Sequence, residues 1–409
     1  MPVIATLALL AMGGSKPLTV APASKFVDFV GVHSQLWGYK SDHADFSDLP
    51  PDPKLYHSVL RPRIAELGIR HMRMALPSNP VQLGTMRDLA TLGVKVTAIV
   101  EPDRFGNDYD KIVSILRSIR PVLEAVEGPN EPDNRGKNEW LDEEIATLRR
   151  LRQALKGDPE LRNLPLIGPA LTQGRPQGRL TTPFQTDARA VGPLADYGNV
   201  HMYDKPVPHP ADSYDVRAFA YRKTPYHGLP IIATETGYPT STDEKGVSER
   251  TQAKFILRRL FDYRVNGMVR TYIYDLIDLS TNHDDAESNF GLLRHDGSPK
   301  PAFQALAQVM EWMAQPSATK VRSMNISISS PKIRSAAYGL RDGILLVLWN
   351  PSTSTSGDEN VRTMVNLGRR FPSIVRMDPL DRGRKEILSP GRTVLTDVPD
   401  WPIVLRLRG

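Results

Sequence analysis

Between residues 26 and 314, short apolar runs alternate with longer segments whose apolar residues recur at helical spacing. We expect strands at residues 26–33, 69–76, 94–100, 122–126, 164–171, 197–203, 231–236 and 269–276. We expect one helix that ends at residue 67. We expect further helices at residues 80–93, 108–120, 140–155, 216–222, 248–265 and 301–313. This alternation predicts an α/β protein with a parallel sheet covered by helices, and eight successive units predict a closed (β/α)8 TIM barrel.

The pattern changes near Gln315. From there to residue 409 the apolar runs are short, and Gly, Pro, Ser and Asp separate them. Such runs are typical of a small antiparallel β domain. We therefore expect a barrel at residues 18–314 and a smaller C-terminal antiparallel β-sandwich at residues 315–409, which fits a chain longer than most single domains.

Residues 3–12 are apolar and are followed by Gly13-Gly14-Ser15. This run is too short to span a bilayer, so no membrane span is expected. It resembles the apolar half of a secretory signal but has no preceding Lys or Arg. We treat residues 1–17 as a candidate leader remnant and expect a secreted or periplasmic protein, with a cytoplasmic location as the alternative. The absence of cysteine is compatible with both locations.

The net charge of +6 comes without long blocks of Lys or Arg. A solvated surface explains it better than nucleic-acid binding, so no nucleic-acid partner is expected. An anionic polysaccharide stays open as a substrate. The sequence carries no signal for an oligomeric state.

Two glutamates come at the ends of strand-like runs. The run 122–126 leads into Glu127-Gly128-Pro129-Asn130-Glu131-Pro132, where the two prolines prevent the strand or a helix from continuing. Alone, this stretch is equally typical of a turn. A second run, 230–236, contains Glu235 near its end. Two such carboxyl groups, one protonated and one ionised, are what double-displacement glycoside hydrolysis requires.

These residues resemble a known family. Asn130-Glu131-Pro132 after the fourth run and Glu235 in the seventh resemble the signature of the clan A retaining glycoside hydrolases, with families 39 and 5 nearest. Arg73 in the second run and His201-Met202-Tyr203 in the sixth extend the resemblance, which covers residues 26–314. Together these motifs, in this order and at barrel spacing, are fairly specific.

The resemblance implies a role for each matching residue. Glu131 is then the general acid/base and Glu235 the nucleophile. Arg73 keeps Glu235 ionised by a charge-assisted hydrogen bond, as electrostatics alone would also suggest. Tyr203 hydrogen-bonds Glu235, and Asn130 contacts the sugar hydroxyl beside the reacting carbon. The alternative for Arg73, an interior ion-pair residue without a role in the reaction, stays open.

One departure from the family concerns the eighth run. Many members have a tryptophan at its end, whereas this chain has Tyr274 or Asp275 in that region. We therefore expect these two residues to line the sugar site. Further candidate sugar-binding side chains, which are histidines in the strand-like runs or aromatic residues, are His33, Trp37, Trp140, His201 and Tyr238.

No metal or other cofactor is expected. The cluster His283-Asp284-Asp285 matches no Ca²⁺ or Zn²⁺ ligand spacing. The sequence thus predicts a retaining glycoside hydrolase acting on an oligo- or polysaccharide. A catalytically silent carbohydrate-binding barrel and a transglycosylase are the alternatives, because a barrel by itself does not imply activity.

Overall fold

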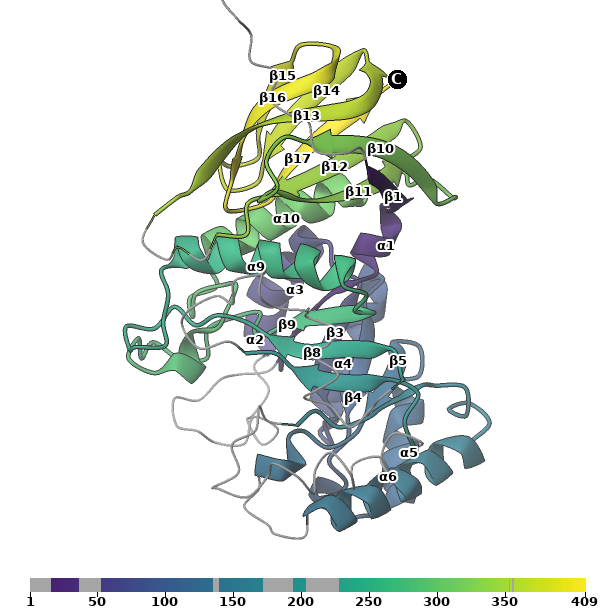
Figure 1. Cartoon of the computed structure of the whole chain (residues 1–409). Coiled ribbons are helices and arrows are strands. Elements are labelled where there is room, and N and C mark those ends of the chain that lie inside the picture. Colours follow the sequence, from purple (N-terminus) through teal and green to yellow (C-terminus); the bar gives the residue numbers. More distant parts are fainter. Residues whose placement is uncertain are drawn as a thin grey trace, which may run out of the picture. The chain divides into compact units, whose positions relative to one another are not determined.

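The computed structural model describes residues 16–36, 53–134, 140–171, 194–203, 228–352, 354 and 357–409. The chain divides into two compact units (Figure 1). One comprises residues 26–310, and the other comprises residues 1–25 together with 311–409. No helix within the described ranges is both long enough and apolar enough to cross a bilayer.

The described part of the first unit contains an eight-stranded sheet in the order β6-β5-β4-β3-β2-β9-β8-β7, with parallel neighbours. The strands are β2 (Val30–His33), β3 (His71–Ala75), β4 (Lys95–Ile99), β5 (Leu123–Glu127), β6 (Leu166–Ile167), β7 (Gly198–His201), β8 (Ile231–Thr236) and β9 (Arg270–Ile273). Ile167 bridges Tyr197 in parallel, and the Gly168 N–H donates to the Tyr197 carbonyl at 3.1 Å. These contacts join β6 to the start of β7, so the ring closes and the predicted barrel is confirmed.

The main helices of the barrel begin and end close to the predicted residues. They are α3 (Arg61–Leu67), α4 (Pro80–Asp88), α5 (Tyr109–Ser118), α6 (Trp140–Gly157), α9 (Glu249–Val265) and α10 (Pro301–Met313). Asp108 and Ser248 cap α5 and α9 by accepting hydrogen bonds from backbone N–H groups of the first turn. Gly68 ends α3 in the left-handed conformation, with φ of 67°. The helix expected at residues 216–222 lies outside the described residues.

The first predicted strand was too long. Residues 24–27 form the short helix α1 (Ser24–Val27), and strand β2 begins only at Val30. The Phe26 ring stacks on Phe261 with ring centroids 4.5 Å apart. A short apolar run fits a buried helix as well as a strand, so periodicity alone could not separate the two.

The described part of the second unit forms a nine-stranded sheet in the order β15-β14-β17-β12-β11-β1-β10-β13-β16. Its strands are β1 (Lys16–Pro22), β10 (Arg322–Ile328), β11 (Arg334–Leu340), β12 (Gly343–Trp349), β13 (Asn360–Phe371), β14 (Ser373–Asp378), β15 (Arg384–Leu388), β16 (Gly391–Pro399) and β17 (Ile403–Arg408). Neighbours are antiparallel except β1 and β11. Leu346 of β12 and Val398 of β16, from distant positions in this order, share one buried core. The sheet therefore folds over on itself, which confirms the predicted β-sandwich.

The N-terminal segment belongs to the sandwich unit. We assigned residues 1–17 to a leader and 18–25 to the barrel, whereas residues 16–22 form β1 between β10 and β11. Val20 lies opposite Arg322 and Ala337 and is buried in the sandwich core. Alternation of apolar residues identifies a strand but does not indicate which sheet it joins, so the sequence could not assign this segment.

A partly buried ionic cluster joins three barrel strands near their N-terminal ends. His71 Nδ1 lies 2.9 Å from both carboxylate oxygens of Glu124, and Arg270 Nη1 lies 2.9 Å from one of them. The Tyr272 hydroxyl is 3.3 Å from the same carboxylate. Burial works against ionisation of Glu124, but His71 and Arg270 outweigh it and lower the pKa of the carboxyl group.

We expect Glu124→Gln to lower the free energy of unfolding by about 1–3 kcal/mol at pH 7, because it leaves the buried His71 and the partly buried Arg270 without their anionic acceptor. The pKa of Glu124 is lower in the folded state, so its contribution is complete above the unfolded pKa of about 4.3 and is lost as the pH falls further. Urea unfolding of both proteins at several pH values measures this. Glu160→Gln, at an exposed position, is the control. A difference that does not shrink in acid would contradict the assignment.

Candidate active site

Glu131 sits in a turn at the C-terminal end of β5. Its backbone is left-handed, with φ of 42°, which is uncommon for a residue other than glycine. Two neighbouring segments hold this turn. The Glu131 N–H donates to the Ala170 carbonyl at 3.1 Å, and the Asn130 N–H donates to Glu101 Oε1 at 2.8 Å. The turn therefore presents Glu131 at the end of the barrel where the strands' carboxyl ends meet.

Glu235 lies in β8 and is only 8% exposed. Arg73 Nη1 donates to its Oε1 at 2.6 Å, and the Tyr203 hydroxyl donates to its Oε2 at 2.7 Å. Burial raises the pKa of this carboxyl group, but His201 and Arg73 outweigh burial and lower the pKa to about 2. Glu235 is thus an ionised carboxylate at neutral pH.

Arg73 is fully buried and surrounded by acceptors. Its Nε and Nη2 donate to the two carboxylate oxygens of Glu127 at 2.7 and 2.8 Å. Nη2 also donates to Asn130 Oδ1 at 2.7 Å, and Nη1 donates to Glu235 and to His33 Nδ1, the latter at 3.1 Å. A guanidinium has five N–H donors, so each has an acceptor here and the group has a single orientation.

His33 is a neutral acceptor. Arginine can only donate, so the His33 Nδ1 that faces Arg73 must carry a lone pair. Burial and the adjacent Arg73 charge lower the pKa of this imidazole to about 3. The ring therefore adds no positive charge to the site at neutral pH and keeps its proton on Nε2.

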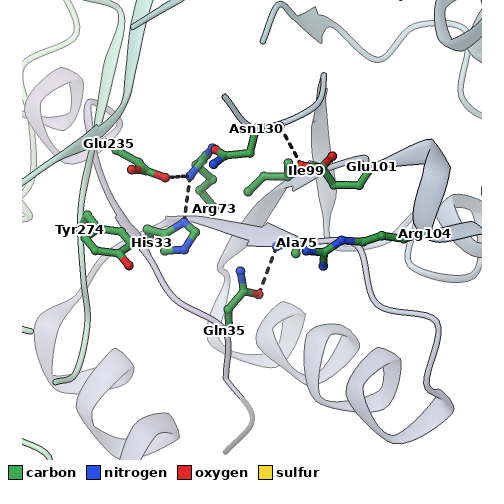
Figure 2. Close-up of a pocket in the computed structure, with 10 residues that line it drawn as sticks. All are labelled: His33, Gln35, Arg73, Ala75, Ile99, Glu101, Arg104, Asn130, Glu235 and Tyr274. Atoms are coloured by element: carbon green, nitrogen blue, oxygen red, sulfur yellow. Dashed lines mark hydrogen bonds and ion pairs between the residues drawn. The ribbon is translucent and has the colours of Figure 1, made fainter. Parts of the chain in front are cut away.

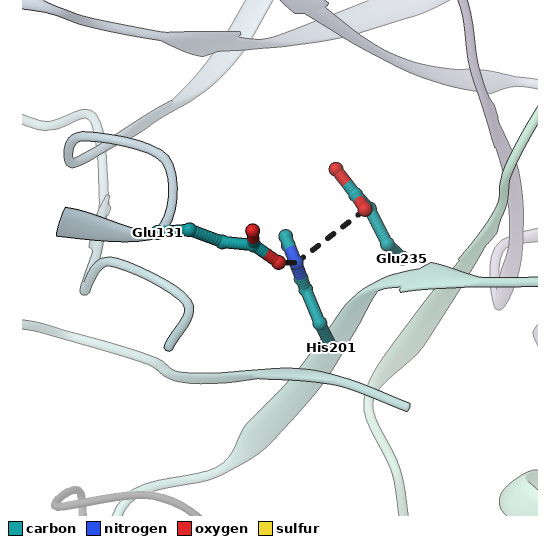
Figure 3. Close-up of side chains that lie close together, drawn as sticks. All are labelled: Glu131, His201 and Glu235. Carbon is teal, nitrogen blue, oxygen red and sulfur yellow. Dashed lines mark hydrogen bonds and ion pairs between the residues drawn. The ribbon is translucent and has the colours of Figure 1, made fainter. Parts of the chain in front are cut away.

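His201 lies between the two candidate catalytic carboxylates (Figure 3). Its Nδ1 is 2.7 Å from Glu131 Oε1 and 3.4 Å from Glu235 Oε2. One oxygen of each carboxylate and this nitrogen all lie within 4.8 Å of one another. Glu131 and Glu235, which lie 70 and 34 residues from His201 in the sequence, are thus brought together by closure of the barrel.

Three aromatic rings line the side of the site beside Glu235. The rings of Tyr203 and Tyr274 meet edge-to-face with centroids 6.3 Å apart, and Phe290 packs against both at 5.5 and 5.4 Å. The Tyr274 ring also lies 5.2 Å from the His33 ring, and its peptide bond to Asp275 is cis. Tyr274 directly follows β9 (Arg270–Ile273), and its proposed place in the sugar site stays a prediction.

A pocket of about 170 Å³ opens beside these groups (Figure 2). Five of the predicted residues line it, namely His33, Arg73, Asn130, Glu235 and Tyr274. The rest of the lining was not predicted from the sequence and comprises Gln35, Ala75, Ile99, Glu101 and Arg104. These residues follow or end neighbouring strands, so an analysis of every strand end could have found them.

Other predicted site residues lie elsewhere. Asp275 is 2% exposed and accepts a hydrogen bond from the Leu276 N–H, and burial raises the pKa of its carboxyl group well above the usual value. It does not line the pocket. Tyr238 is buried beneath the Arg259 guanidinium, which lies 4.3 Å from its ring centroid, so it is a core residue. Trp140 is buried at the start of α6, and Trp37 lies outside the described residues.

Glu127 is a further residue of the site that was not predicted from the sequence. This residue is fully buried at the end of β5 and binds Arg73 through both carboxylate oxygens. Asn199, also buried, donates from Nδ2 to Glu127 Oε1 at 2.9 Å. The signal in the sequence was the position of Glu127 directly after the strand-like run 122–126. A carboxylate there would be buried and would need a partner.

Within the described residues, Glu131, His201 and Glu235 form a group whose donor atoms could hold a metal ion. Nitrogen and carboxylate oxygen ligands of this kind suit several divalent cations. The positive charge that a cation would bring to Glu235 is already supplied by Arg73, 2.6 Å away. The expectation that no metal is required stays a prediction.

No protein-family model matches the chain, and no curated protein matches it. Solved structures do match. A family 39 glycoside hydrolase from the gut symbiont Bacteroides cellulosilyticus WH2 has a TM-score of 0.61 and 16% identity, over 93% of this chain and 81% of that one. The α-L-arabinofuranosidase of Thermotoga maritima has a TM-score of 0.59 and 10% identity, over 96% and 100% of the two chains. A glucosidase from Croceicoccus marinus has a TM-score of 0.58 and 13% identity, over 97% and 98%.

At these identities the comparisons establish the fold. The chain shares the fold of these three proteins, as the resemblance to the clan A glycoside hydrolases predicted. The match extends over both units of this chain, because the shared region is 93% or more in each comparison.

We expect Tyr203→Phe to raise the pKa of Glu235 by about one to two units, because the variant removes a hydrogen bond to the ionised carboxylate. Carbon-13 NMR titration of protein labelled at the glutamate carboxyl groups measures this change, and Glu235→Gln identifies the resonance. Tyr238→Phe, which removes a buried hydroxyl group elsewhere, is the control. A Glu235 titration that is the same in the wild type and in Tyr203→Phe would contradict the assigned contact.

Proposed function

We propose that this protein is a retaining glycoside hydrolase that cleaves O-glycosidic bonds of an oligo- or polysaccharide. The observation that carries the proposal is the pairing of Glu131 and Glu235, in which one carboxylate oxygen of each lies within 4.8 Å of the other. Retaining enzymes keep their two carboxyl groups about 5–5.5 Å apart, whereas inverting enzymes need about 6.5–9.5 Å to admit a water molecule. The short separation supports the retaining mechanism.

The two carboxyl groups divide the reaction between them. In the first step Glu131 donates a proton to the leaving oxygen while Glu235 attacks the anomeric carbon, so the glycosidic bond breaks and a glycosyl ester of Glu235 forms. In the second step Glu131 takes a proton from water, which attacks the same carbon and releases Glu235 as a carboxylate. Each step inverts the anomeric carbon, so the product retains its configuration.

The surrounding contacts fit this division of roles. Arg73 and Tyr203 donate to different oxygens of Glu235, which keeps the nucleophile ionised and oriented. His201 contacts Glu131 at 2.7 Å and holds the acid/base side chain toward the reacting bond. Asn130 Oδ1 accepts from Arg73, so the group that Asn130 offers to a sugar hydroxyl is its amide N–H.

Trapping identifies the nucleophile. We expect a 2-deoxy-2-fluoro glycoside with a good leaving group, chosen from a panel of sugars, to add its glycosyl mass to the peptide that contains Glu235. Peptide mass spectrometry measures the adduct, which should be absent in Glu235→Gln and present in Glu143→Gln, at an exposed position of α6. Label on another residue would contradict the assignment, and no label across the panel would favour a carbohydrate-binding barrel without activity.

The acid/base role of Glu131 has a separate signature. We expect Glu131→Gln to slow cleavage of substrates with poor leaving groups by about 10²–10⁴-fold, because general acid catalysis is lost. Aryl glycosides with acidic phenols need no protonation, so their first step should change far less. Steady-state kinetics across a series of leaving groups measures this dependence. An equal loss for all leaving groups would contradict the role. Product analysis with an added sugar acceptor separates hydrolysis from transglycosylation.

A further inference from the structure

Glu127 is a fully buried carboxylate that the proposed mechanism does not use. Its Oε2 accepts from Arg73 Nε at 2.7 Å. Its Oε1 accepts from Arg73 Nη2 at 2.8 Å and from Asn199 Nδ2 at 2.9 Å. Because it occupies one whole edge of the guanidinium, Glu127 determines which N–H groups of Arg73 turn toward Glu235.

Residues of the neighbouring strands β7 and β8 extend the hydrogen bonding of Glu127. Asn199 of β7 donates both to Glu127 and to the Gly168 carbonyl, the latter at 3.0 Å. Its Oδ1 accepts from the Thr234 hydroxyl at 2.6 Å, and Thr234 directly precedes Glu235 in β8. A continuous buried chain of hydrogen bonds therefore runs from Thr234 through Asn199, Glu127 and Arg73 to the carboxylate of Glu235.

The charges of this cluster change during double displacement. The unreacted site holds the Arg73 cation between two carboxylates, Glu127 and Glu235. When Glu235 attacks the anomeric carbon, the electron pair of the breaking bond leaves with the glycosidic oxygen, which takes its proton from Glu131. Glu235 is then a neutral ester. Without Glu127, a fully buried guanidinium would face that ester with no anionic partner, which is a costly arrangement.

We propose that Glu127 is the permanent counter-ion of Arg73 and that it balances the charge of the site while Glu235 carries the sugar. This inference rests on the proposed function. Glu127 touches neither the sugar nor the reacting atoms, so it is a positioning residue that acts through Arg73. It allows Arg73 to orient the nucleophile in the free enzyme and to remain paired in the glycosyl-enzyme.

Removal of this charge should affect the two chemical steps in opposite directions. In Glu127→Gln the free enzyme retains the ion pair between Arg73 and Glu235. In the glycosyl-enzyme of this variant, Arg73 has lost both of its carboxylate partners, Glu127 and Glu235. The intermediate is therefore destabilised relative to the free enzyme. Its formation becomes slower, and its breakdown, which restores the Glu235 carboxylate beside Arg73, becomes faster. A loss of packing or of local order would not accelerate either step.

The trapping reagent measures both steps. We expect Glu127→Gln to lower the rate constant for inactivation by the 2-deoxy-2-fluoro glycoside by at least about 10-fold, and to raise the rate constant for reactivation of the purified adduct by several-fold. Glu127→Asp keeps the charge but shortens the side chain. Its two rate constants should fall together, so their ratio stays within about three-fold of the wild type. Thermal unfolding of each variant reports its folded state.

The outcomes distinguish failure of the proposed function from failure of the counter-ion role of Glu127. Wild-type protein that is never labelled on Glu235 would overturn the proposed function and this inference with it. Wild-type labelling together with equal slowing of both steps in Glu127→Gln, or with no change in either, would overturn the inference alone. Should Glu127→Gln not fold, a ten-fold change in the ratio for Glu127→Asp would also overturn it. Slower inactivation with faster reactivation would support the counter-ion role.

Discussion

The buried guanidinium of Arg73 is the interaction on which the site depends. Moving an arginine out of water is costly unless every donor finds an acceptor, and a buried cation also needs anionic partners. The barrel supplies both. His33 from β2, Glu127 and Asn130 from the end of β5, and Glu235 from β8 surround the group, all within 3.1 Å of it. The C-terminal ends of four strands are thereby linked through one side chain, since Arg73 itself lies in β3.

The same cation decides the chemical state of the site. A carboxyl group as buried as Glu235 would ordinarily favour its protonated form. His201, the Arg73 cation and the Tyr203 hydroxyl reverse that preference at Glu235. Glu131 lies in a more exposed turn and also contacts His201. Two residues of the same type thus meet different surroundings, which is the condition for one to act as a nucleophile and the other as an acid.

Much of the fold could be predicted from the sequence. Strands β3 to β5 and β8 begin and end within about two residues of the predicted runs, β9 (Arg270–Ile273) ends before its predicted run at 269–276, and α3 ends at Leu67 as expected. Prediction failed where a local pattern had two physical solutions. The run beginning at Phe26 forms a helical turn before its strand, and residues 16–22 pair with strands more than three hundred residues away. Strand β15 has four exposed residues and thus no apolar face to reveal it.

The sequence by itself determined that two glutamates would follow the apolar cores of two strands, because apolar periodicity and turn-forming residues are local properties. Only the tertiary structure decided what surrounds them. That Glu127 is buried against Arg73, that Asp275 turns toward the backbone and that Tyr274 faces the pocket depend on contacts across the closed ring. Arg73 is 54 residues from Glu127 and 162 from Glu235, and no local pattern specifies which acceptors the closure of a barrel will bring to one guanidinium.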